Sequence, residues 1–385
     1  MKILITTDWY KPVINGVVTS VENLIKGLVL AGNEVRVLTL SGNIYSGEEG
    51  IVYYIGSISV GMIYENARLK FTVPANIIQD ILGWKPYIVH SQCEFSTFGV
   101  AREIAYECKI PLIHTYHTVY ENYTHYFCFN HVMGKKMAEF FSKKILSDVN
   151  AVIAPSEKIQ VMLEKYGISK TIYNIPSGIN MEQYESDKSD KRRKLRASLR
   201  IEPDECMLIY VGRLAKEKNI EELFGFLAKI SPEQRMLIVG DGPYCPELEK
   251  TADALGVRKQ LIFIGMVPQE QVPDYYAIGD IFISASNSET QGLTYMEAMA
   301  SALPLLCKAD DCLKDVIANG KNGLLYHTEE EFIHHFEQLK NDFSYRKRIG
   351  IMARQSIQER YSIPAFAASC LRVYHESIQS VEVCV

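Results

Sequence analysis

Short apolar runs of strand length alternate with segments of helical periodicity along the whole chain. In the helical segments, such as residues 17–30 and 219–227, apolar residues recur at intervals of three and four positions. Because neighbouring parallel strands need a crossover connection, this alternation predicts parallel sheets covered by helices on both faces. The expected strands are residues 2–6, 34–40, 87–91, 111–115, 151–154 and 172–175, then 207–212, 235–240, 261–265, 281–285 and 303–307.

The runs form two series, which indicates two doubly wound α/β domains. The length of 385 residues agrees, because a domain usually holds about 100–200 residues. Pro176-Ser177-Gly178 closes the first series, and the highly charged segment 185–200 is interpreted as a linker and an exposed helix rather than a nucleic-acid site. We therefore expect Rossmann-like domains over residues 1–176 and 177–360. Open sheets bind ligands at the carboxyl ends of their strands, so the expected site is a cleft that both domains face.

The overall charge argues against a polyanionic partner. The chain has 41 Lys+Arg and 46 Asp+Glu, a net formal charge of −5, so no nucleic acid is expected. The nine cysteines form no Cys-x-x-Cys pair and are interpreted as reduced thiols of a cytoplasmic protein. No stretch approaches the ~18 apolar residues of a membrane span, and the first apolar run reaches Asp8 too early for a secretory signal. We expect a soluble or peripheral cytoplasmic protein.

Two glycine-bearing loops after expected strands have residues that suit phosphate. Gly16 precedes a helix, where the missing side chain lets a phosphate approach backbone N–H groups, although a turn would also favour glycine. Gly212 ends a strand, and Arg213 and Lys218 flank the start of the next helix. An arginine fork and a lysine point charge fit a diphosphate, and a solvated charged loop would have the same residues. Neither loop has the Gly-x-Gly-x-x-Gly pattern of nicotinamide-binding domains.

The loop SETQGLTYMEAMA at residues 288–300 is the most informative. Glu289 is expected in the loop, and Glu297 about one turn into the following helix. The end of that helix would present N–H groups to an anion, namely those of Gly292, Leu293 and Thr294. Carboxylates beyond a phosphate site can accept hydrogen bonds from sugar hydroxyls, so the loop fits a nucleotide sugar. Otherwise Glu289 is an exposed loop acid and Glu297 a helix residue beside the core.

Together, these motifs resemble a known enzyme family. GRLAKEKN and ETQGLTYMEAMASALP are similar to the phosphate loop and the Glu-x7-Glu signature of family 4 retaining glycosyltransferases, which have the GT-B fold. The likeness covers nearly the whole chain, through TDWYKPVINGVVTS, HTYHTVYENYTHYF, AVIAPSE, IPSGI and GDGPY. SETQGLTYMEA and HTYHTVYE also resemble bacterial 1,2-diacylglycerol 3-glucosyltransferases, which make monoglucosyldiacylglycerol. In such relatives the last helices, here residues 361–385, cross back to the first domain, which holds the acceptor on the membrane side.

The resemblance implies roles for the donor-site residues. Arg213 and Lys218 would neutralise the donor diphosphate and the leaving nucleoside diphosphate. Glu297 would bind the ribose hydroxyls, and Glu289 the sugar hydroxyls at C3 and C4. His117 would contact the donor sugar near C6, beside the reacting carbon. Backbone amides would line the sugar and phosphates, at Gly16, Gly212, Gly292, Leu293 and Thr294.

The resemblance also implies the reaction. A hexose, glucose by family likeness, would move with retention from a UDP-sugar such as UDP-glucose to diacylglycerol at the inner face of a bacterial cell membrane. No prosthetic group or metal is expected, because Arg213, Lys218 and a helix end would offset the leaving-group charge; the chain lacks the Asp-x-Asp metal motif of the other common transferase fold. Many relatives have Gly-Phe-Gly where this chain has Thr290-Gln291-Gly292, which leaves the donor sugar open.

Three other functions use part of the same sequence pattern. A family 4 transferase with a soluble or polysaccharide acceptor would keep all the donor motifs. A UDP-sugar epimerase of the same fold would release an altered sugar, and the Glu-x7-Glu signature argues against it. A non-catalytic binding module would not need this set of cations, glycines and glutamates.

One segment has the pattern of a membrane-surface helix. Met137, Phe140, Phe141 and Ile145 share one helical face, with lysines on both sides. Such a helix can lie on anionic headgroups, or its apolar residues can face the core with the lysines as a solvated rim. The expected membrane contacts are Lys135, Lys136, Phe140, Phe141, Lys143 and Lys144. A nearby aromatic run could line an acceptor groove, belong to the same membrane face or be part of the core, and all three interpretations stay open. Its members are Tyr116, Tyr120, Tyr123, Tyr126, Phe127 and Phe129.

Overall fold

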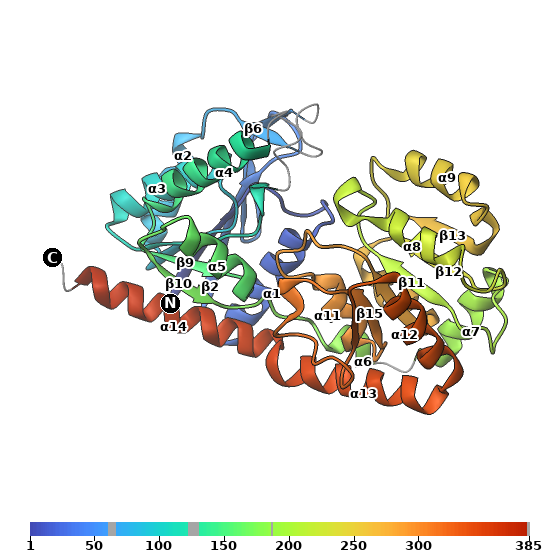
Figure 1. Ribbon diagram of the computed structural model, residues 1–385. Helices are drawn as coiled ribbons and strands as arrows, with labels where there is room; N and C mark the ends of the chain where they lie inside the picture. The colour runs from blue at the N-terminus through green and yellow to red at the C-terminus, as the bar shows by residue number, and fades with distance from the viewer. Residues whose placement is uncertain (61–66, 122–130, 186–187, 383–385) are drawn as a thin grey trace. The chain divides into compact units, whose positions relative to one another are not determined.

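The computed structural model describes residues 1–60, 67–121, 131–185 and 188–382. The chain divides into two compact units, Met1–Gly178 together with Ile363–Val385, and Ile179–Ser362. The boundaries expected from the sequence, after residues 176 and 360, lie two residues before these. Each unit is Rossmann-like, with a mostly parallel sheet between layers of helices (Figure 1).

The first unit contains an eight-stranded sheet in the order β10-β9-β8-β7-β1-β2-β4-β3. All neighbouring pairs are parallel except β3 with β4. A separate antiparallel pair joins β5 (Ser57–Ser59) and β6 (Arg68–Lys70). The strands of the large sheet are β1 (Lys2–Thr7), β2 (Glu34–Leu40), β3 (Gly47–Glu49), β4 (Val52–Ile55), β7 (Ile88–Ser91), β8 (Leu112–Thr115), β9 (Ala151–Ala154) and β10 (Thr171–Asn174).

Helices cover both faces of this sheet because the central strands are apolar on both sides. Ile3 and Ile5 of β1 face one core, with α1 (Gly16–Leu30) and α14 (Ile363–Glu382), whereas Leu4 faces the other. This alternation follows from the two-residue period of a strand. The second core is covered by α2 (Ala75–Trp84), α3 (Ser96–Cys108), α4 (His131–Leu146) and α5 (Glu157–Lys165).

The C-terminal helix α14 is part of the first unit and packs against α1 (Figure 1). A Cβ atom on Gly27 of α1 would lie 2.7 Å from the Cβ of Ala367, so glycine permits the close helix contact. Tyr374 of α14 reaches the sheet, where its hydroxyl lies 2.6 Å from Nδ1 of the buried His90. The other ring nitrogen of His90 lies 2.7 Å from Oγ1 of Thr115. The last helix is thereby fixed to β7 and β8.

The second unit contains a six-stranded parallel sheet in the order β13-β12-β11-β14-β15-β16. Its strands are β11 (Leu208–Val211), β12 (Met236–Val239), β13 (Leu261–Gly265), β14 (Ile281–Ser284), β15 (Leu305–Lys308) and β16 (Leu324–Tyr326). One face packs on α10 (Val272–Ile278), α11 (Leu293–Ala300) and α13 (Phe343–Arg360). The other packs on α8 (Ile220–Leu227), α9 (Cys245–Ala254) and α12 (Glu329–Asn341). Two short helices precede the sheet, α6 (Glu182–Glu185) and α7 (Ser189–Ser198).

The strands expected from the sequence are all present, with ends that differ by two residues or fewer. The short strands β3, β4, β5, β6 and β16 were not expected. The interpretation of residues 185–200 as a linker and an exposed helix is wrong for part of α7. Arg196 is buried, and it donates to the carbonyl of Ile278 at 2.9 Å and to Asp280 Oδ2 at 3.1 Å.

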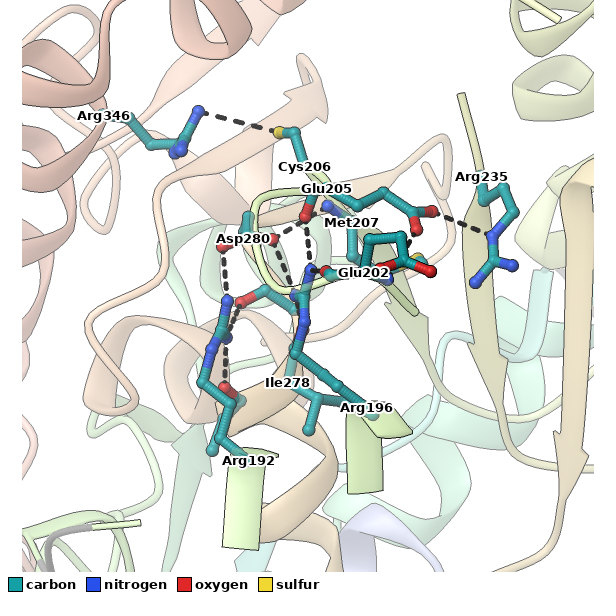
Figure 2. Close-up of polar contacts among 12 residues, drawn as sticks. Arg192, Arg196, Glu202, Glu205, Cys206, Met207, Arg235, Ile278, Asp280 and Arg346 are labelled. Carbon is teal, nitrogen blue, oxygen red and sulfur yellow. Dashed lines mark hydrogen bonds and ion pairs between the residues drawn. The ribbon is translucent and has the colours of Figure 1, made fainter. Parts of the chain in front are cut away.

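Asp280 is the centre of this contact between α7 and the sheet. Figure 2 shows Arg192 and Arg196 converging on its carboxylate. The Arg192 guanidinium lies 2.8 Å from Oδ1, and the backbone N–H of Met207 donates to Oδ2 at 2.9 Å. One carboxylate therefore joins a helix, the loop before β14 and the start of β11.

We expect Asp280→Ala to lower the free energy of unfolding by roughly 3 kcal/mol or more, because it leaves two partly buried guanidinium groups without their carboxylate. Asp190→Ala is the matched control. Asp190 forms an exposed pair with Arg193, and exposed pairs contribute less than about 1 kcal/mol. Urea unfolding of both variants gives the measurement. Equal losses would mean that the network does not stabilise the unit.

Candidate functional site

The polar residues of the second unit collect at the carboxyl ends of β11, β12 and β14. In the strand order, β12 and β13 lie on one side of β11, and β14, β15 and β16 lie on the other. The loops after β11 and β14 therefore leave the sheet in opposite directions. Sheets of this kind usually bind ligands where neighbouring loops diverge in this way.

Backbone contacts fix the loop after β11. Gly240 follows β12 with φ of +132°, and a Cβ atom there would lie 2.0 Å from the carbonyl oxygen of Gly212. The backbone N–H of Leu214 donates to the carbonyl of Asp241 at 2.9 Å. The two loops thus pack main chain against main chain, which sets the path of residues 213–218.

Both cations expected to hold a diphosphate are paired with carboxylates. Lys218 Nζ lies 2.6 Å from Glu289 Oε1, and both side chains are largely buried. Ser286 Oγ donates to the same oxygen at 2.9 Å. Arg213 pairs with Glu217, whose side chain is buried and whose Oε2 has no hydrogen-bond partner. Glu217 was not expected from the sequence. Its position four residues after Arg213 was the available signal.

The helix after the Glu289 loop begins as expected. Gly292 is the N-cap of α11 with φ of +76°, and a Cβ atom there would lie 2.2 Å from Cδ2 of Tyr295. Any other residue would clash and be strained, so glycine is required by both space and conformation. Because glycine has no side chain to cap the helix, the N–H groups of Leu293 and Thr294 are left for a ligand.

Glu297 lies one turn into α11 and is buried. Burial raises its pKa to about 7, although hydrogen bonds from Tyr276 and Gln269 oppose the shift. The Tyr276 hydroxyl donates to Oε2 at 3.0 Å, and Gln269 Nε2 lies 3.5 Å from Oε1. Tyr276 and Gln269 were not expected from the sequence, because only the packing of α10 and of the short 3-10 helix before it (Gln269–Gln271) brings them to Glu297.

The first unit has its own polar cluster at the carboxyl ends of adjacent strands. His117 follows β8, and its Nε2 lies 2.8 Å from Oε1 of Gln92, which follows β7. Burial lowers the pKa of His117 to about 4, so the ring is neutral near pH 7. Gly16 is the first residue of α1, where the Asn15 side chain accepts from the N–H of Val18 at 2.9 Å.

Two buried acids complete this cluster, and neither was expected. Asp8 follows β1 and accepts from the backbone N–H of Thr97 at 2.7 Å. Burial raises its pKa, with opposing hydrogen bonds from Thr97. Glu94 accepts from the hydroxyl of Tyr120 at 2.7 Å, and its other oxygen lies 3.2 Å from Nε2 of the buried His114. The polar residues directly after the strand at 88–91 were the signal for Glu94.

The apolar stripe expected on α4 divides into two parts. Phe140 and Met137 are exposed, by 71% and 55%. Phe141 instead stacks on Phe95 with ring centroids 5.9 Å apart, so its place among the expected membrane contacts was wrong. Ile145 packs on the core, as the alternative interpretation has it. In the aromatic run Tyr116 is buried and Tyr120 half-buried. The remaining members, Tyr123, Tyr126, Phe127 and Phe129, lie outside the described residues.

Two absences hold for the described part of the chain. No group of three or more His, Cys, Asp and Glu side chains in residues 1–60, 67–121, 131–185 and 188–382 is arranged to hold a metal ion. Within the same ranges, none of the helices is long and apolar enough to cross a bilayer.

Comparison with known proteins agrees with this architecture. Residues 14–183 match the model of Glycosyltransferase Family 4, and residues 191–356 match that of Glycosyl transferases group 1. The alpha-monoglucosyldiacylglycerol synthase of Acholeplasma laidlawii is 32% identical over 390 residues, which cover 98% of each chain. The enzyme of the same name from Streptococcus pneumoniae is 33% identical over 337 residues, 86% of this chain and 76% of the relative.

The solved structures share the fold at low sequence identity. The Anabaena protein HepE, solved in complex with UDP and glucose, aligns with a TM-score of 0.77 at 18% identity, over 98% of this chain and 100% of HepE. A sucrose-phosphate synthase from Thermosynechococcus elongatus has a TM-score of 0.77 at 19% identity, over 98% and 99% of the two chains. The chain therefore belongs to glycosyltransferase family 4 and has the GT-B fold.

Proposed function

We propose that the protein transfers a hexose, glucose in the first instance, with retention from a UDP-sugar to a membrane lipid such as 1,2-diacylglycerol. The observation that carries this proposal is the arrangement of Arg213, the Lys218–Glu289 pair and the glycine-capped end of α11. These groups follow β11 and β14, the neighbouring strands whose loops leave the sheet in opposite directions. Diphosphate, sugar hydroxyls and ribose each have a complementary group there. The lipid acceptor is supported by the names of the two relatives at 32–33% identity.

In this proposal the cations do not have to leave their carboxylates to bind phosphate. Arg213 has five N–H donors and can keep Glu217 while it donates to a phosphate oxygen. Lys218 has three donors, so it can bridge Glu289 and the diphosphate. Glu217 and Glu289 would then orient the cations, and Glu289 would also accept hydrogen bonds from the C3 and C4 hydroxyls of the sugar.

The remaining site residues keep the roles given by the family likeness. The amides of Gly292, Leu293 and Thr294, with Gly212 and Gly16, would line the sugar and phosphates. Glu297 would accept from the ribose, and His117 would bind the sugar hydroxyl near C6. The leaving-group charge would be offset by Arg213, Lys218 and the helix end, without a metal. Transferase activity should therefore persist in EDTA.

The α4 surface supports a membrane location for the acceptor. Phe140 and Met137 project from a helix that carries Lys135, Lys136, Lys143 and Lys144, with Val132 and Met133 exposed at its start. Apolar side chains beside lysines suit the boundary of an anionic bilayer. Phe141 is excluded from this surface by its contacts with Phe95 and Tyr120.

One prediction concerns the reaction itself. UDP release from UDP-glucose should rise when diacylglycerol is added in anionic vesicles. Glu289→Ala should lower this release about 100-fold or more, because Lys218 loses its partner and the sugar loses an acceptor. Glu233→Ala, an exposed glutamate of the same unit, is the control. Release that lipid leaves unchanged would retain the transferase and remove the lipid acceptor, and an altered free sugar would favour an epimerase.

Another prediction concerns the pKa of Glu297, which burial raises to about 7. If its carboxylate accepts from the ribose, binding of UDP-glucose needs the ionised form and should weaken about tenfold per pH unit below 7. UDP-glucose is the right ligand because its diphosphate does not titrate in this range. Calorimetry should show proton release on binding near pH 6.5. Glu297→Gln should bind weakly, with no pH dependence and no proton release.

Glu297 also affects stability, with a sign that can be checked. Its folded pKa lies above the unfolded value, so between about pH 4.5 and 7 the folded state binds more protons and stability falls as the pH rises. Thermal unfolding of the free protein at pH 5 and 8 should therefore show a smaller loss in Glu297→Gln than in the wild type. The same pH dependence in both would contradict the raised pKa.

A further prediction concerns α4. Replacing Lys135, Lys136, Lys143 and Lys144 by Glu should strongly weaken sedimentation with anionic vesicles and leave binding of UDP-glucose unchanged. Phe140→Ser should weaken sedimentation, whereas Phe141→Ser should instead lower stability, because Phe141 packs inward. Unchanged vesicle binding by the lysine variant would remove α4 from the proposal.

A further inference from the structure

Helix α13 of the second unit has one buried face and one exposed face, on which apolar and basic residues lie together. Ile349, Ala353 and Ile357 are buried against the unit. The contact is close, because a Cβ atom on Gly350 would lie 2.1 Å from the carbonyl oxygen of Ala302. At 100° per residue, Ile351 then lies on the far side of the helix.

The exposed side of α13 carries three large apolar side chains among polar and charged residues. Phe343 is 65% exposed, Ile351 44% and Met352 42%. These side chains lie along one open groove of ≈ 460 Å³, whose full lining is Phe343, Ser344, Lys347, Arg348, Ile351, Met352 and Gln355. Scattered exposed apolar residues are normal, but a contiguous set along a groove marks an interaction surface.

The charge of this surface is opposite to that of its surroundings. Residues 179–362 hold 24 Lys+Arg and 29 Asp+Glu, a net formal charge of −5, whereas residues 343–360 hold five Lys+Arg and one Asp+Glu, a net charge of +4. Lys347 and Arg348 are exposed, and neither forms an ion pair within the part of the chain that the structure describes. Exposed cations without carboxylates beside apolar side chains complement an anionic lipid surface.

We propose that α13 is a second lipid-binding surface of the protein, separate from α4. Phe343, Ile351 and Met352 enter the boundary between headgroups and acyl chains, and Lys347 and Arg348 bind lipid phosphates. This inference rests on the proposed function in one respect, because it needs the protein to act at a membrane. One short amphipathic helix provides only a few apolar side chains, so by itself it would bind a membrane weakly. A second surface would strengthen this attachment and leave it reversible.

Brominated lipids test this surface directly. Phe343→Trp should lose its added fluorescence on vesicles of phosphatidylglycerol and brominated phosphatidylcholine, because bromine quenches only a nearby indole. Leu255→Trp is the matched control, since Leu255 is 42% exposed in the same unit. The wild-type chain has two tryptophans, and its fluorescence is subtracted from that of each variant. Quenching of Trp at 343 and not at 255 supports the proposal. Vesicle binding without quenching at 343 overturns it.

A charge exchange supplies the second test. Lys347→Glu with Arg348→Glu should weaken partition into anionic vesicles about tenfold or more, because each cation near an anionic surface adds to the electrostatic attraction. Lys259→Glu with Lys321→Glu makes the same change in charge on exposed residues of the same unit and should have little effect. Equal losses overturn the proposal. A dimer in solution that only the first variant dissociates would assign the face to a second copy, and would also overturn it.

The outcome is separable from that of the proposed function. The vesicle assays contain no donor and no diacylglycerol, so they do not depend on transfer. Quenching at 343 without lipid-stimulated UDP release would keep this surface and remove the lipid acceptor. Stimulated release without quenching would do the reverse.

Discussion

Parallel strand pairing is the constraint on which the sites of this protein depend. All carboxyl ends of a parallel sheet lie on one edge, and the strands themselves are buried and apolar, so polar groups gather in the loops of that edge. In the second unit the order β12-β11-β14 sends two of these loops apart. The contact between Gly240 and Gly212 then fixes the loop that carries Arg213 and Lys218. Side chains placed by such a backbone are held before a ligand arrives.

Two carboxylates balance the two cations of the candidate site, so the site would be nearly neutral before it bound a dianionic diphosphate. Arg213 is matched by Glu217, and Lys218 by Glu289. Leaving either cation unpaired in a largely buried position would cost more free energy than pairing it, which explains why the carboxylates are present. Affinity for the proposed diphosphate would then depend on the direction of the N–H donors more than on net charge. The N–H groups at the start of α11 supply further donors.

How far the sequence predicted the structure depended on whether a signal was local. The strand positions, the glycine before α11 and the place of Glu297 one turn later follow from local pattern, and the structure has them. The burial of Arg196 does not, because its partner Asp280 lies 84 positions away and resembles a turn residue. Phe140 and Phe141 are adjacent, and only the position of Phe95 decides which of them turns inward.

The first unit places a further limit on the chemistry. With its pKa lowered to about 4, His117 is almost entirely neutral at pH 7 and cannot serve as a cation for a phosphate. Gln92 Oε1 lies 2.8 Å from Nε2, so that nitrogen carries the proton and donates it, and Nδ1 is left as an acceptor. An acceptor nitrogen suits a hydroxyl of a sugar. The ring is therefore suited to recognise an uncharged polar group, and in the proposed reaction charge stabilisation would fall to Arg213, Lys218 and the end of α11.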